Sequence, residues 1–212
     1  MQRSEQEVPQ VGRAMLGSLT LLLGLPLALG TGTRSCAPLI PVTFDSDTIP
    51  GLLGPWTYIV GASKYPPHLE ELKAVKFAAF SFSPSSHEDE LDVNEVMRLN
   101  DTCVVSNTSK ILIFWNNSTL AHVEDKVYSM AELIRSDKDL LILRHLNTDY
   151  PSLSLSARTP TVNEEYLEDF KAHLRCLGFS EEEIFVTSEK DACPLPWEKA
   201  EENKSDAEPQ VV

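Results

Sequence analysis

The chain has 212 residues and a formal net charge of −14, from 18 basic and 32 acidic side chains. This length supplies enough apolar side chains for one hydrophobic core or two small ones. The acidic balance disfavours nucleic acids and anionic membrane surfaces as partners, because both are bound through clustered positive charge. With 42% hydrophobic and 24% charged residues, the composition is that of a globular protein and not of a disordered chain or a membrane bundle.

The N-terminal region has the pattern of a secretory leader. Residues 16–30 carry no charge, and the stretch is long enough for the apolar part of a signal peptide but short for a membrane span. We therefore expect residues 1–34 to be a signal peptide and leader, with Met15 as an alternative start. The protein is then secreted, with no membrane insertion. Removing 1–34 takes away three basic and two acidic residues, so the acidity belongs to the mature protein.

Cysteines and glycosylation sequons agree with secretion. The four cysteines all follow the leader, an even number that allows three disulfide pairings. No two of them are close in sequence, so we expect no metal site. Clustering of four sequons between 100 and 119 predicts an exposed glycosylated edge, and the overlapping pair in this cluster is expected to carry at most one glycan. The acceptor asparagines are Asn100, Asn107, Asn116, Asn117 and Asn203.

The middle of the chain alternates short extended runs with turn residues. The runs are rich in β-branched and aromatic residues, which is typical of strands. Eight strands at regular spacing favour an up-and-down antiparallel sandwich or barrel. The predicted strands are 56–63, 75–83, 90–99, 103–115, 119–124, 127–134, 140–146 and 152–157.

One amphipathic helix is predicted after the last strand. Thr161 and Glu164 have the spacing of a capping box, and Gly178 is placed to end the helix. We expect this helix to pack on the outside of the sheet, against Leu153 and Leu155. Its single apolar face is formed by Leu167, Phe170, Leu174 and Leu177.

Two motifs at the ends of this region resemble those of the lipocalins. Gly54-Pro55-Trp56 resembles the G-x-W motif that opens the first lipocalin strand, and Arg158 resembles the basic residue that follows the last strand. The chain is further similar to the orosomucoid branch of the family, to the fish saxitoxin- and tetrodotoxin-binding proteins and to apolipoprotein M. The segments that carry the orosomucoid resemblance are CAPLIPV at 36–42, FSFSP at 80–84, ELIRSDKDLLIL at 132–143 and DACPL at 191–195.

The resemblance implies a fold and a domain organisation. The fold is all-β: an eight-stranded up-and-down antiparallel lipocalin barrel with a C-terminal α-helix packed on its outside. The lipocalin domain covers residues 35–194, and residues 195–212, rich in Pro, Glu, Lys, Asn and Gln, are expected to form a disordered acidic tail. Trp56 is expected to plug the closed end against Arg158. The resemblance also implies the disulfides Cys36–Cys176 and Cys103–Cys193.

Strand alternation separates the barrel interior from its exterior. On the third strand, Glu95 shares a face with Leu91 and Val93. A carboxylate on an apolar face must reach solvent at the barrel mouth, meet a cation or take up a proton. The resemblance implies that Glu95 is an acidic pocket residue that faces basic ligands.

The remaining pocket residues come from the resemblance and from strand parity. Tyr58, Phe80 and Phe82 match pocket positions of the family, although a Phe pair is also typical of a packed core. Parity places Arg144 with Ile142, and it either pairs with Glu95 or lies at the rim in water. The candidate ligand-binding residues are Tyr58, Phe80, Phe82, Val93, Glu95, Ile142, Arg144, Ser154 and Ser156.

These observations favour a binding protein over an enzyme. The resemblance implies a monomeric acute-phase or immunomodulatory plasma glycoprotein that carries small amphipathic ligands such as basic drugs, steroids, lipids or toxins. A carrier of guanidinium toxins or lipids, and a secreted interaction protein with no ligand, are the alternatives. No cofactor is expected, and the sequence has no G-x-S-x-G, H-E-x-x-H or P-loop pattern. Because all cysteines are expected to be paired, no thiol nucleophile is expected either. The histidines are expected at the surface: His68, His87, His122, His145 and His173.

Overall fold

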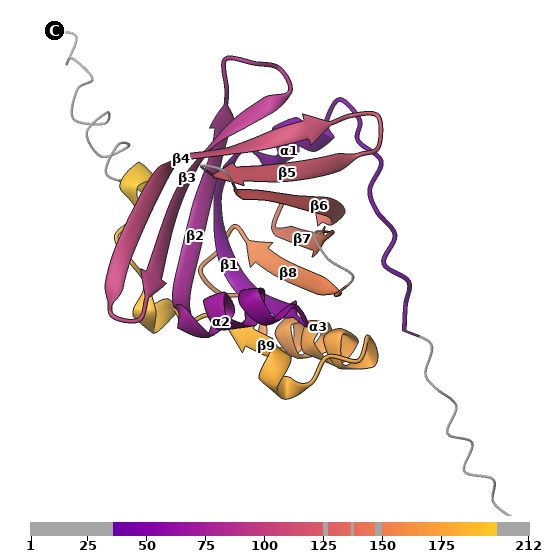
Figure 1. Ribbon diagram of the computed structural model, residues 1–212, viewed down its shortest axis with the longest axis vertical. Helices are drawn as coiled ribbons and strands as arrows, with labels where there is room; N and C mark the ends of the chain where they lie inside the picture. The colour runs from indigo at the N-terminus through magenta and orange to yellow at the C-terminus, as the bar shows by residue number, and fades with distance from the viewer. Residues whose placement is uncertain (1–35, 125–126, 137, 147–149, 199–212) are drawn as a thin grey trace, which may run out of the picture. The chain divides into compact units, whose positions relative to one another are not determined.

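The computed structural model describes residues 36–124, 127–136, 138–146 and 150–198. The expected leader at 1–34 and the sequon at Asn203 lie outside these ranges. The described chain forms one antiparallel sheet in the order β2-β3-β4-β5-β6-β7-β8-β1, and pairing of β1 with β2 closes it into a barrel (Figure 1). The strands are β1 (Gly54–Ser63), β2 (Val75–Pro84), β3 (Glu90–Leu99), β4 (Thr102–Phe114), β5 (Thr119–Glu124), β6 (Val127–Ser136), β7 (Leu140–His145) and β8 (Ser152–Ala157).

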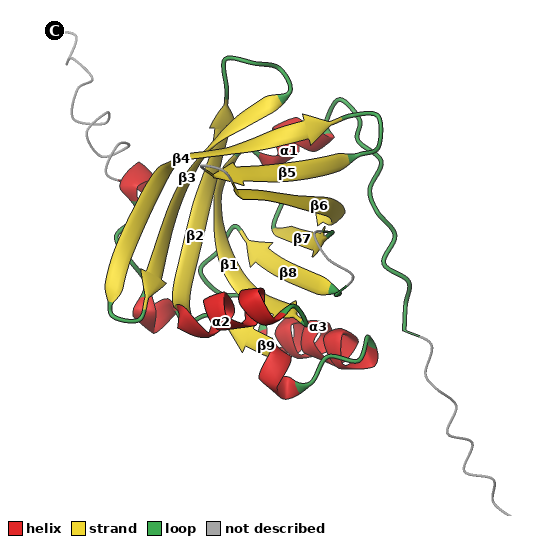
Figure 2. Cartoon of the chain, viewed as in Figure 1, coloured by secondary structure: helices red, strands yellow, loops and turns green. Residues whose placement is uncertain are grey.

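The predicted barrel is confirmed, and each strand lies within two residues of its predicted range. A ninth strand, β9 (Ile184–Val186), pairs with the second half of β1. The main helices are α1 (Thr48–Leu52), α2 (Pro66–Ala74) and α3 (Glu164–Cys176), and two short 3₁₀ turns follow at Glu181–Glu183 and Glu189–Asp191. Figure 2 shows the helices in red around the yellow strands of the barrel.

Trp56 and Arg158 hold the closed end of the barrel together. The buried Trp56 ring donates its Nε1–H to the carbonyl of Leu52 at 2.8 Å. The Arg158 guanidinium stacks 3.6 Å from the centre of that ring and donates to the carbonyls of Pro55 and Gly51 at 2.8 and 2.9 Å. These contacts tie α1, the start of β1 and the segment after β8 to one another.

Gly54 is favoured at the start of β1 by its backbone conformation. Its φ is +90°, which residues with a Cβ rarely adopt. The G-x-W motif thus combines the backbone freedom of its glycine with the ring on which Arg158 stacks.

Helix α3 packs on the outside of the barrel through the predicted apolar face. Phe170 and Leu174 are buried in one cluster with Leu153 and Leu155, as expected. The helix begins differently from the prediction, because the Asn163 side chain caps it by accepting from the Glu165 N–H at 2.8 Å. Thr161 therefore lies outside the cap, and the predicted capping box is wrong at this position.

The C-terminal end of α3 follows the prediction. Gly178 directly follows the C-cap residue Leu177 and has a φ of +84°, which glycine adopts without steric cost. The left-handed residue turns the chain away from the helix toward β9.

Both expected disulfides, Cys36–Cys176 and Cys103–Cys193, are present. They close loops of 140 and 90 residues, and the chain-entropy argument gives a stabilisation of about 4–5 kcal/mol for loops of this length. The second disulfide lies in an outer cluster on which Leu195 and Trp197 pack. The predicted tail therefore begins too early: residues 195–198 are part of the folded domain, and 199–212 lie outside the described ranges.

We predict that Arg158→Ala lowers the free energy of unfolding by about 2 kcal/mol, because two charge-assisted hydrogen bonds and a cation–π contact are lost. Arg175→Ala is the matched control, since Arg175 is an exposed arginine that pairs with Glu181. Exposed pairs contribute about 0–1 kcal/mol. Urea unfolding of both variants tests the prediction, and equal losses would contradict it.

Candidate functional site

The barrel interior is divided into an apolar floor and a polar belt. The floor lies around Trp56 at the closed end, where Phe82, Val93 and Leu133 are buried in one cluster. Phe80 packs against this cluster, and its ring centroid lies 5.0 Å from that of Phe82. The floor is thus filled by its own side chains.

Above the floor, the strands contribute polar side chains to the same interior. The register shows their common face: His122 is paired with Ile111 and Ser129, and His145 with Ser152. We use the name polar belt for seven interior residues that come from seven different strands. They are Tyr58, Glu95, Ser109, His122, Ser129, His145 and Ser154.

Glu95 is the carboxylate of the polar belt, on the interior face that parity predicts. It accepts a hydrogen bond from the Ser109 hydroxyl at 3.1 Å, and its Oε1 lies 3.0 Å from His122 Nε2. The side chains of Glu95 and His122 are 18% and 31% exposed, so the pair is largely shielded from water. The hydrogen bond that the imidazole donates to Glu95 raises the pKa of His122 above its ordinary 6.5, against the opposing effect of burial.

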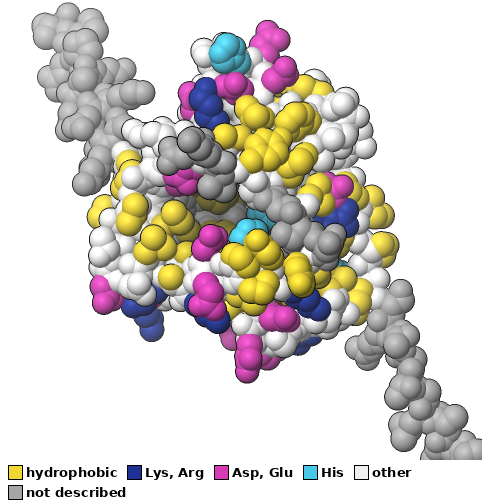
Figure 3. Space-filling model, viewed as in Figure 1, with side chains coloured by type: hydrophobic (Ala, Val, Ile, Leu, Met, Phe, Trp, Pro, Cys, Tyr) yellow, Lys and Arg dark blue, Asp and Glu magenta, His cyan; other side chains and the backbone are white. Residues whose placement is uncertain are grey.

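A cavity of about 180 Å³ lies between the belt and α2. Helix α2 has no buried residue of its own, and it covers the cavity through His68, Glu71 and Leu72. From the barrel, the cavity is lined by Tyr58, Ser129, His145, Ser152 and Leu153. Figure 3 shows histidine side chains recessed in a hollow of the molecular surface, beside acidic and hydrophobic side chains.

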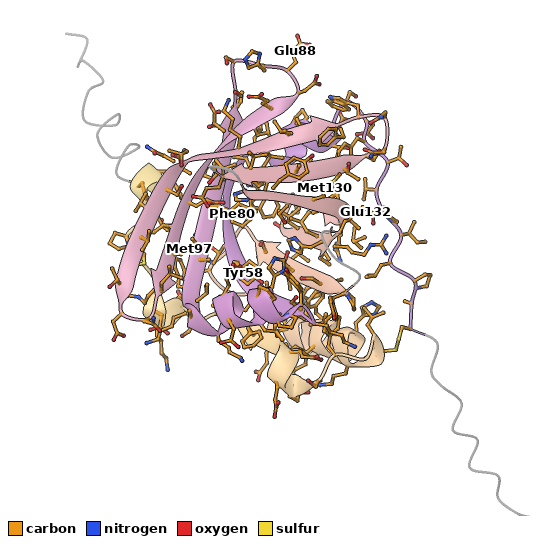
Figure 4. All side chains as sticks on the ribbon, viewed as in Figure 1. Tyr58, Phe80, Glu88, Met97, Met130 and Glu132 are labelled. Carbon is orange, nitrogen blue, oxygen red and sulfur yellow. A yellow bond between two sulfur atoms is a disulfide. The ribbon has the colours of Figure 1, made fainter. Side chains whose placement is uncertain are left out.

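Tyr58 places its hydroxyl inside this cavity because of Gly61. A Cβ on Gly61 would lie 1.5 Å from the Tyr58 hydroxyl oxygen and 2.7 Å from Cζ, so only glycine leaves room for the ring. The Tyr58 side chain lies between β1 and α2 (Figure 4). Burial raises the pKa of the phenol well above its ordinary 10, so the hydroxyl stays protonated.

His145 is held uncharged on the opposite side of the cavity. Its Nε2 lies 3.1 Å from the Ser154 hydroxyl. Burial, with a smaller effect from the charges of His68 and His122, lowers the pKa of His145 to about 4. At neutral pH, His145 therefore offers a neutral imidazole to the cavity.

Two of the candidate pocket residues face the wrong way for that role. Ile142 is paired with Leu155 and is buried with it in the outer cluster beneath α3. Arg144 is paired with Leu153 on the same outer face and forms an ion pair with Glu132 of β6. The expected placement of Ile142 and Arg144 in the cavity is therefore wrong, and so is the pairing of Arg144 with Glu95.

The structure places the other candidates at different depths. Phe82 and Val93 belong to the packed floor, whereas Tyr58 lines the cavity. Ser154 bonds to His145, and Ser156 is buried opposite Leu141 of the floor. The expectation that the histidines are surface residues is wrong for two members of the polar belt, His122 and His145. Gly61 is a further site residue that strand parity did not identify.

The predicted glycosylation edge is exposed. Asn100, Asn107, Asn116 and Asn117 are all exposed, and they lie at the β3–β4 turn, on β4 and at the β4–β5 turn. Ser109, which completes the Asn107 sequon, is buried and donates to Glu95. Use of these sequons stays a prediction.

Comparison with known proteins identifies the class. Residues 38–196 match the ApoM domain family. Alpha-1-acid glycoprotein of Bos taurus is 33% identical over 201 residues, covering 92% of this chain and 98% of that protein. The alpha-1-acid glycoprotein of Oryctolagus cuniculus is 27% identical over 198 residues, covering 91% and 98%.

Solved structures with the same fold are the siderocalin Ex-FABP and a deswapped triple mutant of bovine odorant-binding protein. Their TM-scores are 0.55 and 0.51, each at 17% sequence identity. They cover 68% and 69% of this chain, and 99% of their own chains. At this identity the likeness concerns the fold alone.

The chain belongs to the lipocalins, in the family of the ApoM domain. Within that family it is orosomucoid-like, as its motifs predicted. The fold and these relatives support a carrier of small hydrophobic ligands. Among the helices in the described ranges, none is long and apolar enough to cross a membrane.

The pKa values of the two histidines in the polar belt should be shifted in opposite directions. By NMR, we expect His122 to titrate above pH 6.5 and His145 near pH 4. Stability from the His122 pair is fully present below pH 6.5, and it is lost as pH rises through the raised pKa. His145 acts in the other direction: the unfolded state binds its proton more readily, so stability falls between pH 6.5 and 4.

Glu95→Gln is the control for this titration. It removes the carboxylate that raises the pKa of His122, so that pKa should fall, while His145 should still titrate near pH 4. A His145 that titrates near 6.5 would show that its side chain is hydrated and not buried.

Proposed function

We propose that the protein is a secreted, monomeric plasma glycoprotein that carries small lipophilic or amphipathic molecules, preferentially cationic ones, in its barrel. The observation that carries this proposal is the Glu95 carboxylate, which lies on the interior face of the barrel with its side chain 18% exposed. An acute-phase or immunomodulatory role follows from the orosomucoid-like relationship alone. Two long-range disulfides and the exposed sequons support an extracellular location.

Glu95 is suited to hold a cation because its partners leave its charge uncompensated whenever His122 is neutral. Ser109 is a neutral donor, and a neutral His122 also supplies only a hydrogen bond. A ligand ammonium or guanidinium group adds a charge-assisted hydrogen bond in a partly dehydrated site, where such bonds are strong. The apolar body of the ligand then lies against Phe80 at the top of the floor.

Protonation of His122 should oppose this binding. When His122 is charged, it neutralises Glu95 and competes with the ligand for the same carboxylate oxygens. Because the pKa of His122 is raised above 6.5, this competition begins close to neutral pH. A cationic ligand is then bound at plasma pH and released on acidification.

Matched probes test the role of Glu95. We expect 1-naphthalenemethylamine, a cation at neutral pH, to bind the wild-type protein at least tenfold more tightly than 1-methylnaphthalene. Glu95→Gln should weaken amine binding by roughly 10- to 100-fold, the value of one charge-assisted hydrogen bond, and should leave methylnaphthalene binding unchanged. Displacement of N-phenyl-1-naphthylamine measures both affinities. Lowering the pH from 7.4 to 5.5 should weaken amine binding to the wild-type protein.

Glu132→Gln is the matched control, because Glu132 is also an ion-paired carboxylate, with a side chain 21% exposed, but on the outer face. Its amine affinity should equal that of the wild type. If Glu95→Gln binds the amine as tightly as the wild-type protein does, Glu95 is not part of the binding site. If none of the probes, nor a steroid, a lysolipid or a guanidinium compound, raises the melting temperature, the carrier function is wrong and an interaction role without a ligand is favoured.

A further inference from the structure

We propose that the cavity beneath α2 is a second, hydrogen-bonding subsite, whose barrel side is uncharged and takes a hydroxyl or carbonyl group of the carried ligand. This inference rests on the proposed carrier function. It predicts that the preferred ligand has a neutral polar group in addition to its cationic group. The subsite is formed by Tyr58, Ser129, His145 and Ser152, and α2 covers it.

The Tyr58 hydroxyl is the first observation that points to a ligand. Within the described ranges it has no hydrogen-bond partner, although burial raises the pKa of its phenol strongly. Tyr58 is half-buried and its hydroxyl faces the cavity, so the proton can be accepted there by water or by a ligand oxygen. The chain keeps glycine at position 61, which leaves space for this group. A ligand oxygen in the cavity would accept its proton.

His145 is the second observation. It faces Ser154 and Ser152 of β8, and Ser129 of β6 and Tyr58 of β1 line the same cavity. Its own hydrogen bond to Ser154 orients the imidazole. Because its pKa is lowered to about 4, the ring stays neutral at every pH above about 5.

The titratable groups of the lining on the α2 side are His68 and Glu71, and Glu71 is exposed. His122 pairs with the more shielded Glu95 on the β3–β5 side of the barrel, where a cationic group is better placed. The barrel side of the cavity offers neutral donors and acceptors from Tyr58, Ser129 and Ser152. A hydroxyl or carbonyl is the polar group that matches neutral donors and acceptors.

The size of the cavity agrees with a subsite and not with a whole binding site. Its volume is about 180 Å³, below the roughly 300–1,000 Å³ of pockets that enclose a drug-sized ligand. It has room for a polar end group and a short part of an apolar body.

A neutral probe tests the subsite. We expect 1-naphthalenemethanol to bind the wild-type protein more tightly than 1-methylnaphthalene, which has the same ring system and no polar group. Tyr58→Phe should weaken binding of the alcohol roughly 3- to 10-fold, the value of a neutral hydrogen bond, and should leave methylnaphthalene unchanged. Tyr128→Phe, on the outer face of β6, is the control and should bind like the wild type.

The pH profile separates the subsite from the Glu95 site. Alcohol binding should be constant from pH 8 to 5.5 and should weaken only as pH approaches 4, whereas amine binding weakens already at 5.5. Gly61→Ala, which displaces the Tyr58 ring, should reproduce the loss seen in Tyr58→Phe. Circular dichroism and the retained methylnaphthalene affinity show that each variant is folded.

The outcomes distinguish this inference from the function on which it rests. If the amine binds in a Glu95-dependent manner but the alcohol binds no better than methylnaphthalene, or Tyr58→Phe leaves its affinity unchanged, the subsite is wrong and the carrier function stands. If no probe binds, the carrier function is wrong and the subsite with it.

Discussion

Closure of the sheet is the constraint on which the site depends, because it sends every second side chain of each strand into one shared interior. At the closed end this interior is shut by Trp56, Arg158 and α1, and apolar side chains fill it. Burying a polar group costs free energy unless a hydrogen-bond partner can reach it. Such partners are available at the end of the barrel beneath α2. The division into apolar floor and polar belt therefore follows from the barrel being closed at one end.

The elements of this fold could be predicted well from the sequence. Strands of alternating or β-branched residues, separated by turns, carry a local signal, and the G-x-W and Arg158 motifs mark the two ends of the sheet. The face of β3 was also predictable, since Leu91, Val93 and Glu95 alternate with more polar residues. The polar partner of Glu95 was not, because His122 lies 27 residues further along the chain.

The orientation of β7 shows why parity fails for a strand buried on both faces. Its sequence, LLILRH, is apolar on both faces because one face meets the floor and the other is covered by α3. Alternation then gives no contrast, and only the register of Ile142 with Leu155 sets the phase. Placing Arg144 on the inner face also put its neighbour His145 on the outer face, so the sequence did not identify His145 as an interior residue. The prediction of the helix cap was wrong for a more local reason. Asn163 and Thr161 are both residues that commonly cap helices, and the backbone conformation decides which of them does so.

The polar belt also connects binding to stability. A domain with a filled apolar interior would be more stable, because a polar group without a partner in the barrel lowers the free energy of unfolding. The two disulfides and the Arg158 contacts lie at the ends and the outside of the barrel, so they stabilise the sheet without filling the cavity. In the proposed function, a ligand that bonds to the Tyr58 hydroxyl and to the Glu95 carboxylate adds interactions to the folded state and stabilises it by mass action. The net charge of −14 belongs to the chain as a whole, whereas the proposed selection of a ligand depends on one interior carboxylate and on the polar groups around it.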